Sequence, residues 1–235
     1  MTITKGCSFT GIEYPDSDGK PMAESDFQRV YLVYATEVLD IYFQNQPDVY
    51  VSSNLCFYYE EGNPKAYISP DVFVVFGTAK RKRRSYKVWE EDGKYPNFVL
   101  EITSKSTVSE DQGTKKGLYA FWGVQEYFQY DPTGDYLDPP LRGFQLVAGN
   151  YQTIPAEKQD NGNYSICSKV LGLELRLERG ELRFYEPTTG NKLLSHQESE
   201  VARQRAELRA DQEAQRAERL AAKLRELGVD PDTVQ

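Results

Sequence analysis

The chain has 235 residues, of which 39% are hydrophobic and 13% aromatic, so it can bury the core of one sizeable domain and carry an appendage. Its net charge of −8 is unlike that of a protein that coats nucleic acid, but it is compatible with an enzyme that contacts nucleic acid through a local basic patch and bound cations. No run of about 18 apolar residues and no secretory signal occur, and the three cysteines are widely separated, which favours a cytoplasmic protein without a membrane span, a disulfide framework or a zinc cluster.

The first predicted element is a helix. Ser25 can cap its N-terminus, and Gln46-Pro47-Asp48 would end it. Apolar side chains recur in this segment at intervals of three and four residues, which predicts one buried face. The positions expected on that face are Phe27, Val30, Tyr31, Tyr34, Val38 and Ile41.

Three strands, a second helix and a fourth strand are predicted next. β-branched and aromatic residues mark the strands, and Pro70 interrupts the second of them. The order helix, three strands, helix, strand indicates an α/β domain in which the second helix carries the chain to a parallel neighbour in a mixed central sheet. The strand segments are 48–59, 67–76, 97–103 and 126–130, and the second helix is 110–122.

Beyond this core, short strands alternate with Gly and Asn turns from Leu141 to Tyr185. One of these turns is Asn161-Gly162-Asn163. The pattern predicts a small β extension packed on the core. We therefore expect a first domain over residues 1–190, with its core at about 20–135 and the β extension at about 141–190.

Residues 195–235 are predicted to form a charged helical tail. No Gly or Pro occurs from Ser195 to Leu227, and Gly228 is a natural helix stop. A largely alanine seam with a 4-3 spacing permits a weakly specified coiled coil, so we expect a homodimer in which the C-terminal helix takes part. The seam residues are Ala206, Ala210, Glu213, Ala217, Leu220, Leu224 and Leu227.

Two acidic residues stand out within the predicted strands. Asp71 directly follows Pro70, and Glu101 is the one acid in a nearly apolar strand, where an unpaired carboxylate would be costly to bury. If both emerge on one sheet face, they can share Mg²⁺, which prefers hard oxygen ligands. Lys115 follows on the second helix, with Asp111 and Tyr119 one turn to either side. A lysine there can orient or deprotonate a metal-bound water and stabilise charge on a phosphate.

These residues resemble the signature of the PD-(D/E)XK nuclease superfamily. The wider sequence is similar to one branch of it, the Uma-type restriction endonuclease family of bacteria. The resemblance rests on short motifs that are weak singly and specific in their combined order and spacing, and they cover nearly the whole chain. The motifs are Asp18–Glu24, Ser69–Val75, Trp89–Glu91, Phe98–Thr107, Asp111, Lys115, Tyr119, Gly123–Phe128, Tyr136-Leu137, Leu171–Leu173 and Leu224–Asp232.

The resemblance implies a restriction-endonuclease-like αβββαβ core and cleavage of DNA phosphodiester bonds that depends on Mg²⁺ or Mn²⁺. It assigns the catalytic and metal-binding acids to Asp71 and Glu101. The sequence departs from the signature at Thr103, where the signature has lysine. The catalytic lysine role then falls on Lys115 of the following helix.

Several charged residues are alternatives or additions to this site. Lys105 and Lys116 are rivals for the catalytic lysine, and Glu24 and Glu37 of the first helix could add a third metal ligand. The basic run Lys80–Arg84 could bind backbone phosphates, although a run of charges in a loop is usually only solvated.

Three functions are compatible with the sequence. The first is a metal-dependent DNA endonuclease, the second is a nuclease-like fold that serves as a binding or scaffold module through its helical tail, and the third is a structure-specific repair nuclease. The set Asp71, Glu101 and Lys115 favours the first over the second. Structural roles stay open, because Asp71 could cap a turn and Lys115 could be a solvated charge.

Overall fold

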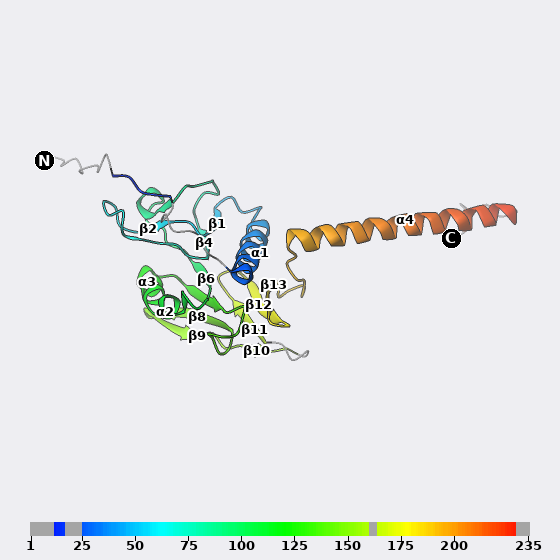
Figure 1. Cartoon of the computed structure of the whole chain (residues 1–235). Coiled ribbons are helices and arrows are strands. Elements are labelled where there is room, and N and C mark those ends of the chain that lie inside the picture. Colours follow the sequence, from blue (N-terminus) through cyan, green and yellow to red (C-terminus); the bar gives the residue numbers. More distant parts are fainter. Residues whose placement is uncertain (1–11, 17–24, 160–163, 229–235) are drawn as a thin grey trace. The chain divides into compact units, whose positions relative to one another are not determined.

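The structure is a computed structural model that describes residues 12–16, 25–159 and 164–228. The chain divides into two compact units, Met1–Leu193 and Leu194–Gln235, which are described separately below (Figure 1). Within the described residues, no helix is long and apolar enough to cross a membrane. The turn expected at Asn161-Gly162-Asn163 lies outside the described residues.

Helix α1 spans Asp26–Tyr42. As expected, Ser25 caps its N-terminus, and the Ser25 side chain accepts a hydrogen bond from the Gln28 backbone N–H. Its buried face is narrower than the apolar pattern indicates. At 100° per residue, two of the expected core residues fall on the flank of the buried stripe, and the third lies in line with the stripe but in the first turn, before the first buried residue. The assignment of these three to the core was wrong. The buried residues are Tyr31, Tyr34, Ala35, Val38 and Leu39, whereas Phe27, Val30 and Ile41 are exposed.

The central sheet has six strands in the order β1-β4-β6-β7-β8-β9. β6 and β7 are parallel, and every other neighbouring pair is antiparallel. With α1 and the helical crossover, β1, β4, β6 and β7 form the αβββαβ core, which confirms the predicted fold class. The strands are β1 Val49–Ser53, β4 Val72–Phe76, β6 Phe98–Ile102, β7 Glu126–Tyr130, β8 Leu141–Val147 and β9 Asn150–Thr153.

Two of the expected long strands are each divided between two sheets. Asn54 adopts a left-handed conformation (φ 46°) after β1, and Pro70 separates the two halves of the second segment. The short halves form a separate three-stranded sheet in the order β3-β2-β5, and the 3-10 helix η1 (Val88–Glu90) follows β5. Its strands are β2 Phe57–Tyr58, β3 Tyr67–Ile68 and β5 Tyr86–Lys87.

The crossover from β6 to β7 consists of two helices rather than the single helix expected over 110–122. α2 spans Val108–Gln112, and α3 spans Thr114–Trp122. They meet at Gly113, whose backbone (φ −112°, ψ −93°) departs from helical geometry. A Cβ atom at this position would lie 2.9 Å from the Ser109 carbonyl oxygen, so glycine suits this close turn.

The segment expected as one β extension lies in two sheets. β8 and β9 continue the central sheet, whereas a separate four-stranded antiparallel sheet, β10-β11-β12-β13, packs with α1 in one hydrophobic cluster. The buried Glu126 carboxylate at the start of β7 accepts hydrogen bonds from the Ser168 hydroxyl and the Lys169 N–H, which ties this sheet to the central one. Its strands are β10 Glu157–Lys158, β11 Tyr164–Ser168, β12 Leu173–Glu178 and β13 Glu181–Tyr185.

The second unit contains helix α4, His196–Glu226. Ser195 and Glu198 form a capping box at its N-terminus, and none of its side chains is buried. Arg203 forms ion pairs with Glu200 and Glu207 at helical spacing along an exposed surface.

Candidate active site

Asp71 and Glu101 lie beside each other because their strands are neighbours. β4 and β6 pair antiparallel with Val72 opposite Leu100, so Asp71, one residue before β4, falls opposite Glu101. Side chains alternate between the two faces of a strand. Phe73 and Val99, which share the parity of Asp71 and Glu101, belong to the hydrophobic cluster that also contains Tyr119 of α3. Both carboxylates are therefore on the sheet face that α3 covers.

Hydrogen bonds fix the relative positions of these two side chains. The Asp71 backbone N–H donates to Glu101 Oε2 at 3.3 Å, and the Ile102 N–H donates to Asp71 Oδ2 at 2.7 Å. Glu101 is fully buried, whereas Asp71 is partly exposed. One carboxylate is thus at the base of the site and the other is nearer to the solvent.

The helical crossover supplies three more polar side chains. Lys115 Nζ lies 3.0 Å from Glu101 Oε2 and 3.4 Å from Asp111 Oδ1. The Tyr119 hydroxyl donates to Glu101 Oε1 at 2.5 Å. Both oxygens of Glu101 are therefore engaged, and the helical spacing of 111, 115 and 119 accounts for the common direction of these groups, even though Gly113 breaks the helix between the first and the second.

The charges in this buried site are unbalanced. Three carboxylates, those of Asp71, Glu101 and Asp111, surround one ammonium group. Burial, and then the charge of Glu101, raises the pKa of Asp71 well above its usual range and raises the pKa of Asp111 to about 6. Burial alone would lower the pKa of Lys115, but the carboxylates of Glu101, Asp71 and Asp111 raise it overall, so Lys115 is protonated at neutral pH.

The residues present fit a divalent cation. With all three acids ionised, the four groups carry a net charge of −2, which one Mg²⁺ would neutralise. Neither carboxylate oxygen of Asp111 accepts a hydrogen bond of normal geometry in the described part of the chain. In the described ranges, no set of three or more Asp, Glu, His or Cys side chains is arranged to hold a metal ion. A metal here would thus have few protein ligands and several waters, as Mg²⁺ prefers.

The structure separates the rival lysines. Lys116 Nζ lies 3.5 Å from the centre of the Phe144 ring, and Lys105 lines a cavity beyond the end of β6. Among the three lysines, Lys115 is the one in contact with Glu101. Glu37 is exposed on α1, which packs on the opposite face of the sheet, and Glu24 lies outside the described residues.

Three of the five cations in the basic run Lys80–Arg84 form ion pairs within the protein. Arg83 binds Glu91 through Nε and Nη2, both at 2.8 Å, and its guanidinium lies 4.1 Å from the centre of the Tyr50 ring. Arg81 also pairs with Glu91, and Lys80 pairs with Asp40. The hydrogen bonds from Arg83 lower the pKa of Glu91. Most of this run is therefore structural.

Sequence reasoning missed a polar layer beneath the site. Gln129 of β7 lies opposite Glu101 in the parallel register and donates to the Tyr127 hydroxyl at 3.1 Å. The Tyr127 hydroxyl in turn donates to the Asp111 carbonyl oxygen at 2.8 Å and so holds α2 against the sheet. The register between β6 and β7 depends on distant residues, so no local signal in the sequence identifies Gln129. The helical spacing that singled out Tyr119 was a sufficient signal for that residue.

The order of helices and strands places the chain in the restriction-endonuclease-like class of α/β folds. A sequence model of the Uma2 family, described as "Putative restriction endonuclease", matches residues 12–178. The match covers well over half of the chain, so the chain belongs to the Uma2 family, which confirms the resemblance seen in its motifs. The motif at Leu224–Asp232 lies beyond the matched range.

A search of solved structures found similarity to a protein from Anabaena variabilis ATCC 29413, described as "a putative nuclease belonging to DUF820". The two chains are 12% identical, the similarity covers 60% of this chain and 73% of the other, and the TM-score is 0.42. The comparison with curated proteins gave no match.

The raised pKa of Asp111 leads to a prediction about the stability of the metal-free protein. An acid whose pKa is higher in the folded state costs stability once the pH exceeds its unfolded value, and the full cost is reached above the folded value. A rise from 3.8 to about 6 corresponds to a cost on the order of 3 kcal/mol at neutral pH. Asp111→Asn should therefore raise the melting temperature in EDTA at about pH 8 and change it little at about pH 4.

Thermal unfolding of both proteins across this pH range measures the difference. A gain that is independent of pH, or a loss that grows with pH, would show that the Asp111 carboxylate is not under electrostatic stress in the folded protein.

Proposed function

We propose that this chain is a cytoplasmic, divalent-metal-dependent DNA endonuclease in which Asp71 and Glu101 hold Mg²⁺ or Mn²⁺ and Lys115 acts on the phosphate. One observation carries the proposal: two carboxylates from adjacent strands and a buried lysine from the crossover meet on one face of the sheet, with a deficit of positive charge. A purely structural ion pair would have no need of the additional acids, because one lysine balances one carboxylate.

Each side chain has a defined part in this proposal. A bound divalent ion would lower the pKa of a coordinated water and polarise a phosphoryl oxygen. Lys115 keeps its proton, so its Nζ serves as a hydrogen-bond donor and cation for the charge that develops on the phosphate rather than as a base. Tyr119, whose pKa burial raises well above its usual range, also keeps its proton and fixes Glu101 through Oε1. Asp71, partly exposed, is the acid closest to solvent and to an arriving strand.

Supercoiled plasmid DNA tests the proposal. The purified protein should nick or linearise the plasmid with Mg²⁺ or Mn²⁺, and EDTA should stop the reaction. Sequence-specific cleavage would give discrete fragments, whereas a structure-specific nuclease would prefer branched or gapped substrates to plasmid. A well-folded protein that binds DNA and cuts none of these substrates would favour the scaffold role over the endonuclease.

We also propose that the protein acts as a homodimer to which α4 contributes. Leu220 and Leu227, both on the expected seam, are 52% and 78% exposed, and none of the side chains of α4 is buried. A second copy of the same helix would cover these positions, and the many Arg and Glu residues beside them could set the register. Two-fold symmetry would present one active site to each strand of a duplex.

Light scattering should therefore give a dimer for the full-length protein and a smaller oligomer for a chain that ends at Leu194. Equal oligomeric states in the two proteins would remove α4 from the interface, and a monomeric full-length protein would exclude the dimer altogether. Leu220→Glu with Leu227→Glu should reproduce the effect of the truncation, while Leu208→Glu, which changes an exposed leucine of the same helix away from the seam, serves as the control.

A further inference from the structure

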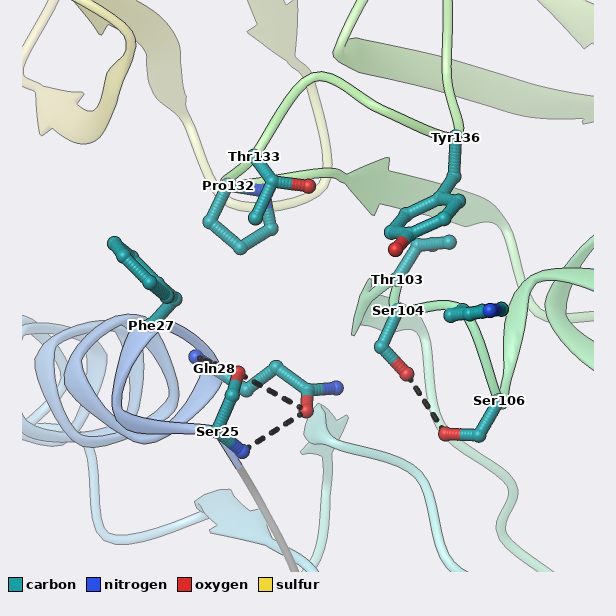
Figure 2. Close-up of a pocket in the computed structure, with 10 residues that line it drawn as sticks. Ser25, Phe27, Gln28, Thr103, Ser104, Ser106, Pro132, Thr133 and Tyr136 are labelled. Atoms are coloured by element: carbon teal, nitrogen blue, oxygen red, sulfur yellow. Dashed lines mark hydrogen bonds between the residues drawn. The ribbon is translucent and has the colours of Figure 1, made fainter.

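A cavity of about 620 Å³ lies beyond the end of β6, next to the candidate active site. Three segments far apart in the sequence form it, and Figure 2 shows their side chains around a common space. Its size is within the range of small-molecule pockets. The lining residues come from the start of α1, from residues 103–106 and from residues 132–136.

Ile102 connects this cavity to the two acids. Its N–H donates to Asp71 Oδ2, and its carbonyl oxygen accepts a hydrogen bond from Gln28 Nε2 at 3.1 Å. Gln28 and Thr103, the next residue after Ile102, both line the cavity. A group held in the cavity would thus lie beside Thr103, two residues after Glu101 in the chain.

Two aromatic side chains stand on opposite sides of the cavity in Figure 2, Phe27 from α1 and Tyr136 from the loop after β7. Phe27 is 62% exposed, which is costly for a phenylalanine. In the described part of the chain, neither ring packs against another aromatic ring, although such pairs are numerous elsewhere in the domain. Both rings are therefore available to contact a planar ligand, either by stacking or edge-on.

The wall that carries Tyr136 is held in place by Asp131. Its two carboxylate oxygens accept hydrogen bonds from the backbone N–H groups of Thr133, Gly134, Tyr136 and Leu137 and from the Thr133 hydroxyl. Asp131 is buried, which alone would raise its pKa, but these hydrogen bonds together outweigh burial and lower it. The Asp131 carboxylate thus fixes the conformation of the loop, so Tyr136 and Thr133 are held in position before a ligand binds.

The polar part of the lining suits an anion. The described lining residues include no acid, although the chain as a whole carries an excess of negative charge. They include the exposed Lys105, for which no ion pair occurs among the described residues, and the hydroxyls of Ser104 and Ser106, 3.0 Å apart. A cation and two hydroxyl groups in a cavity that also has two aromatic rings match the phosphate and the base of one nucleotide.

We propose that this cavity holds one unstacked nucleotide of a DNA strand, with its base against Phe27 and Tyr136 and its phosphate beside Lys105. The inference rests on the proposed function for the identity of the nucleic acid. Taking a nucleotide out of the stack costs least where it is already unpaired. The protein should therefore prefer DNA that contains an unpaired nucleotide to a fully paired duplex.

The test uses a duplex oligonucleotide with one unpaired 2-aminopurine, and the fully paired duplex for comparison, in Ca²⁺ in place of Mg²⁺. Anisotropy gives the affinity, and quenching of 2-aminopurine reports stacking on a ring. Phe27→Ala and Tyr136→Ala should each lose about tenfold in the preference for the unpaired site and should lose the quenching, because stacking on an aromatic side chain contributes roughly this much per base. Phe121→Ala and Tyr164→Ala, which remove exposed rings outside the cavity, are the matched controls and should resemble the wild type.

Lys105→Ala should weaken binding of both duplexes and reduce the salt dependence by about one phosphate contact. A wild-type protein without preference for the unpaired site, or ring variants that keep it, would overturn the inference. If binding depends on the two rings but the protein cuts no DNA, the endonuclease proposal is contradicted and the nucleotide site is supported. If the protein cuts DNA but its binding does not depend on the rings, the nucleotide site is contradicted and the endonuclease proposal is supported.

Discussion

Glu101→Gln should lower the rate of Mg²⁺-dependent DNA cleavage by at least about a thousandfold. A bound metal ion supplies several kcal/mol of transition-state stabilisation, and a neutral amide at this position would not hold the metal. The amide can replace the carboxylate without a loss of packing. Its oxygen can accept the hydrogen bonds from Lys115 and the Asp71 N–H, and its nitrogen can donate to the Tyr119 hydroxyl. The fold should therefore persist while the charge is lost.

Asp71→Asn should have an effect of the same order, since its oxygen can still accept the hydrogen bond from the Ile102 N–H. Plasmid cleavage rates for the two variants, with circular dichroism to verify folding, measure this. Glu126→Gln is the control: Glu126 is also a buried carboxylate in the central sheet, but it binds the turn after β11. Cleavage that survives either Glu101→Gln or Asp71→Asn at more than a few per cent would place the chemistry elsewhere or in a contaminant.

Lys115→Met should lower the cleavage rate by about a hundred- to a thousandfold, the usual loss when one preorganised donor to a developing oxyanion is removed. The Met side chain fills a similar volume, so the main change is the loss of the Nζ charge next to Glu101 and Asp111. The same substitution leaves three acids without a protein cation. In EDTA it should therefore destabilise the protein by about 3–5 kcal/mol at neutral pH, as expected when one partner of a buried charge pair is removed.

Lys116→Met is the matched control, because Lys116 is the next residue on α3 but contacts the ring of Phe144 rather than an acid. Its cleavage rate should remain near that of the wild type. Mg²⁺ should restore more stability to Lys115→Met than to the wild type, because the cation then replaces the missing charge. A Lys115→Met protein that cleaves at the wild-type rate, or a Lys116→Met protein with the larger loss of rate, would show that Lys115 is not the catalytic lysine.

The core of the fold could be predicted because local patterns govern it. The helical spacing placed Asp111, Lys115 and Tyr119 on one side of the crossover, and the strand patterns placed Asp71 and Glu101 in neighbouring strands. These patterns depend on residues close together in the sequence, whereas the common face of the two acids follows from the register of β4 and β6. The family match over residues 12–178 agrees with the core that these patterns indicate.

Other features depend on distant partners and could not be predicted. The apolar pattern of α1 does not show that Phe27 is exposed beside a cavity, because residues 132–136 form the opposite wall. The basic run at 80–84 is consistent with a nucleic-acid-binding patch in the sequence, which does not show that Glu91 pairs with both Arg81 and Arg83. The position of Gln129 opposite Glu101 follows from the parallel pairing of β6 and β7, which no local pattern specifies.

The most direct test of the central claim is to locate a metal ion in the site. Crystals of the protein soaked in Mn²⁺ should show an anomalous difference peak within about 2.1–2.3 Å of a carboxylate oxygen of both Asp71 and Glu101, as a shared divalent ion with hard oxygen ligands requires. Crystals of Glu101→Gln should lack the peak. A peak bound elsewhere on the chain, or an ordered wild-type site that stays without Mn²⁺ at a concentration that supports DNA cleavage, would contradict the assignment of these two acids as the metal ligands.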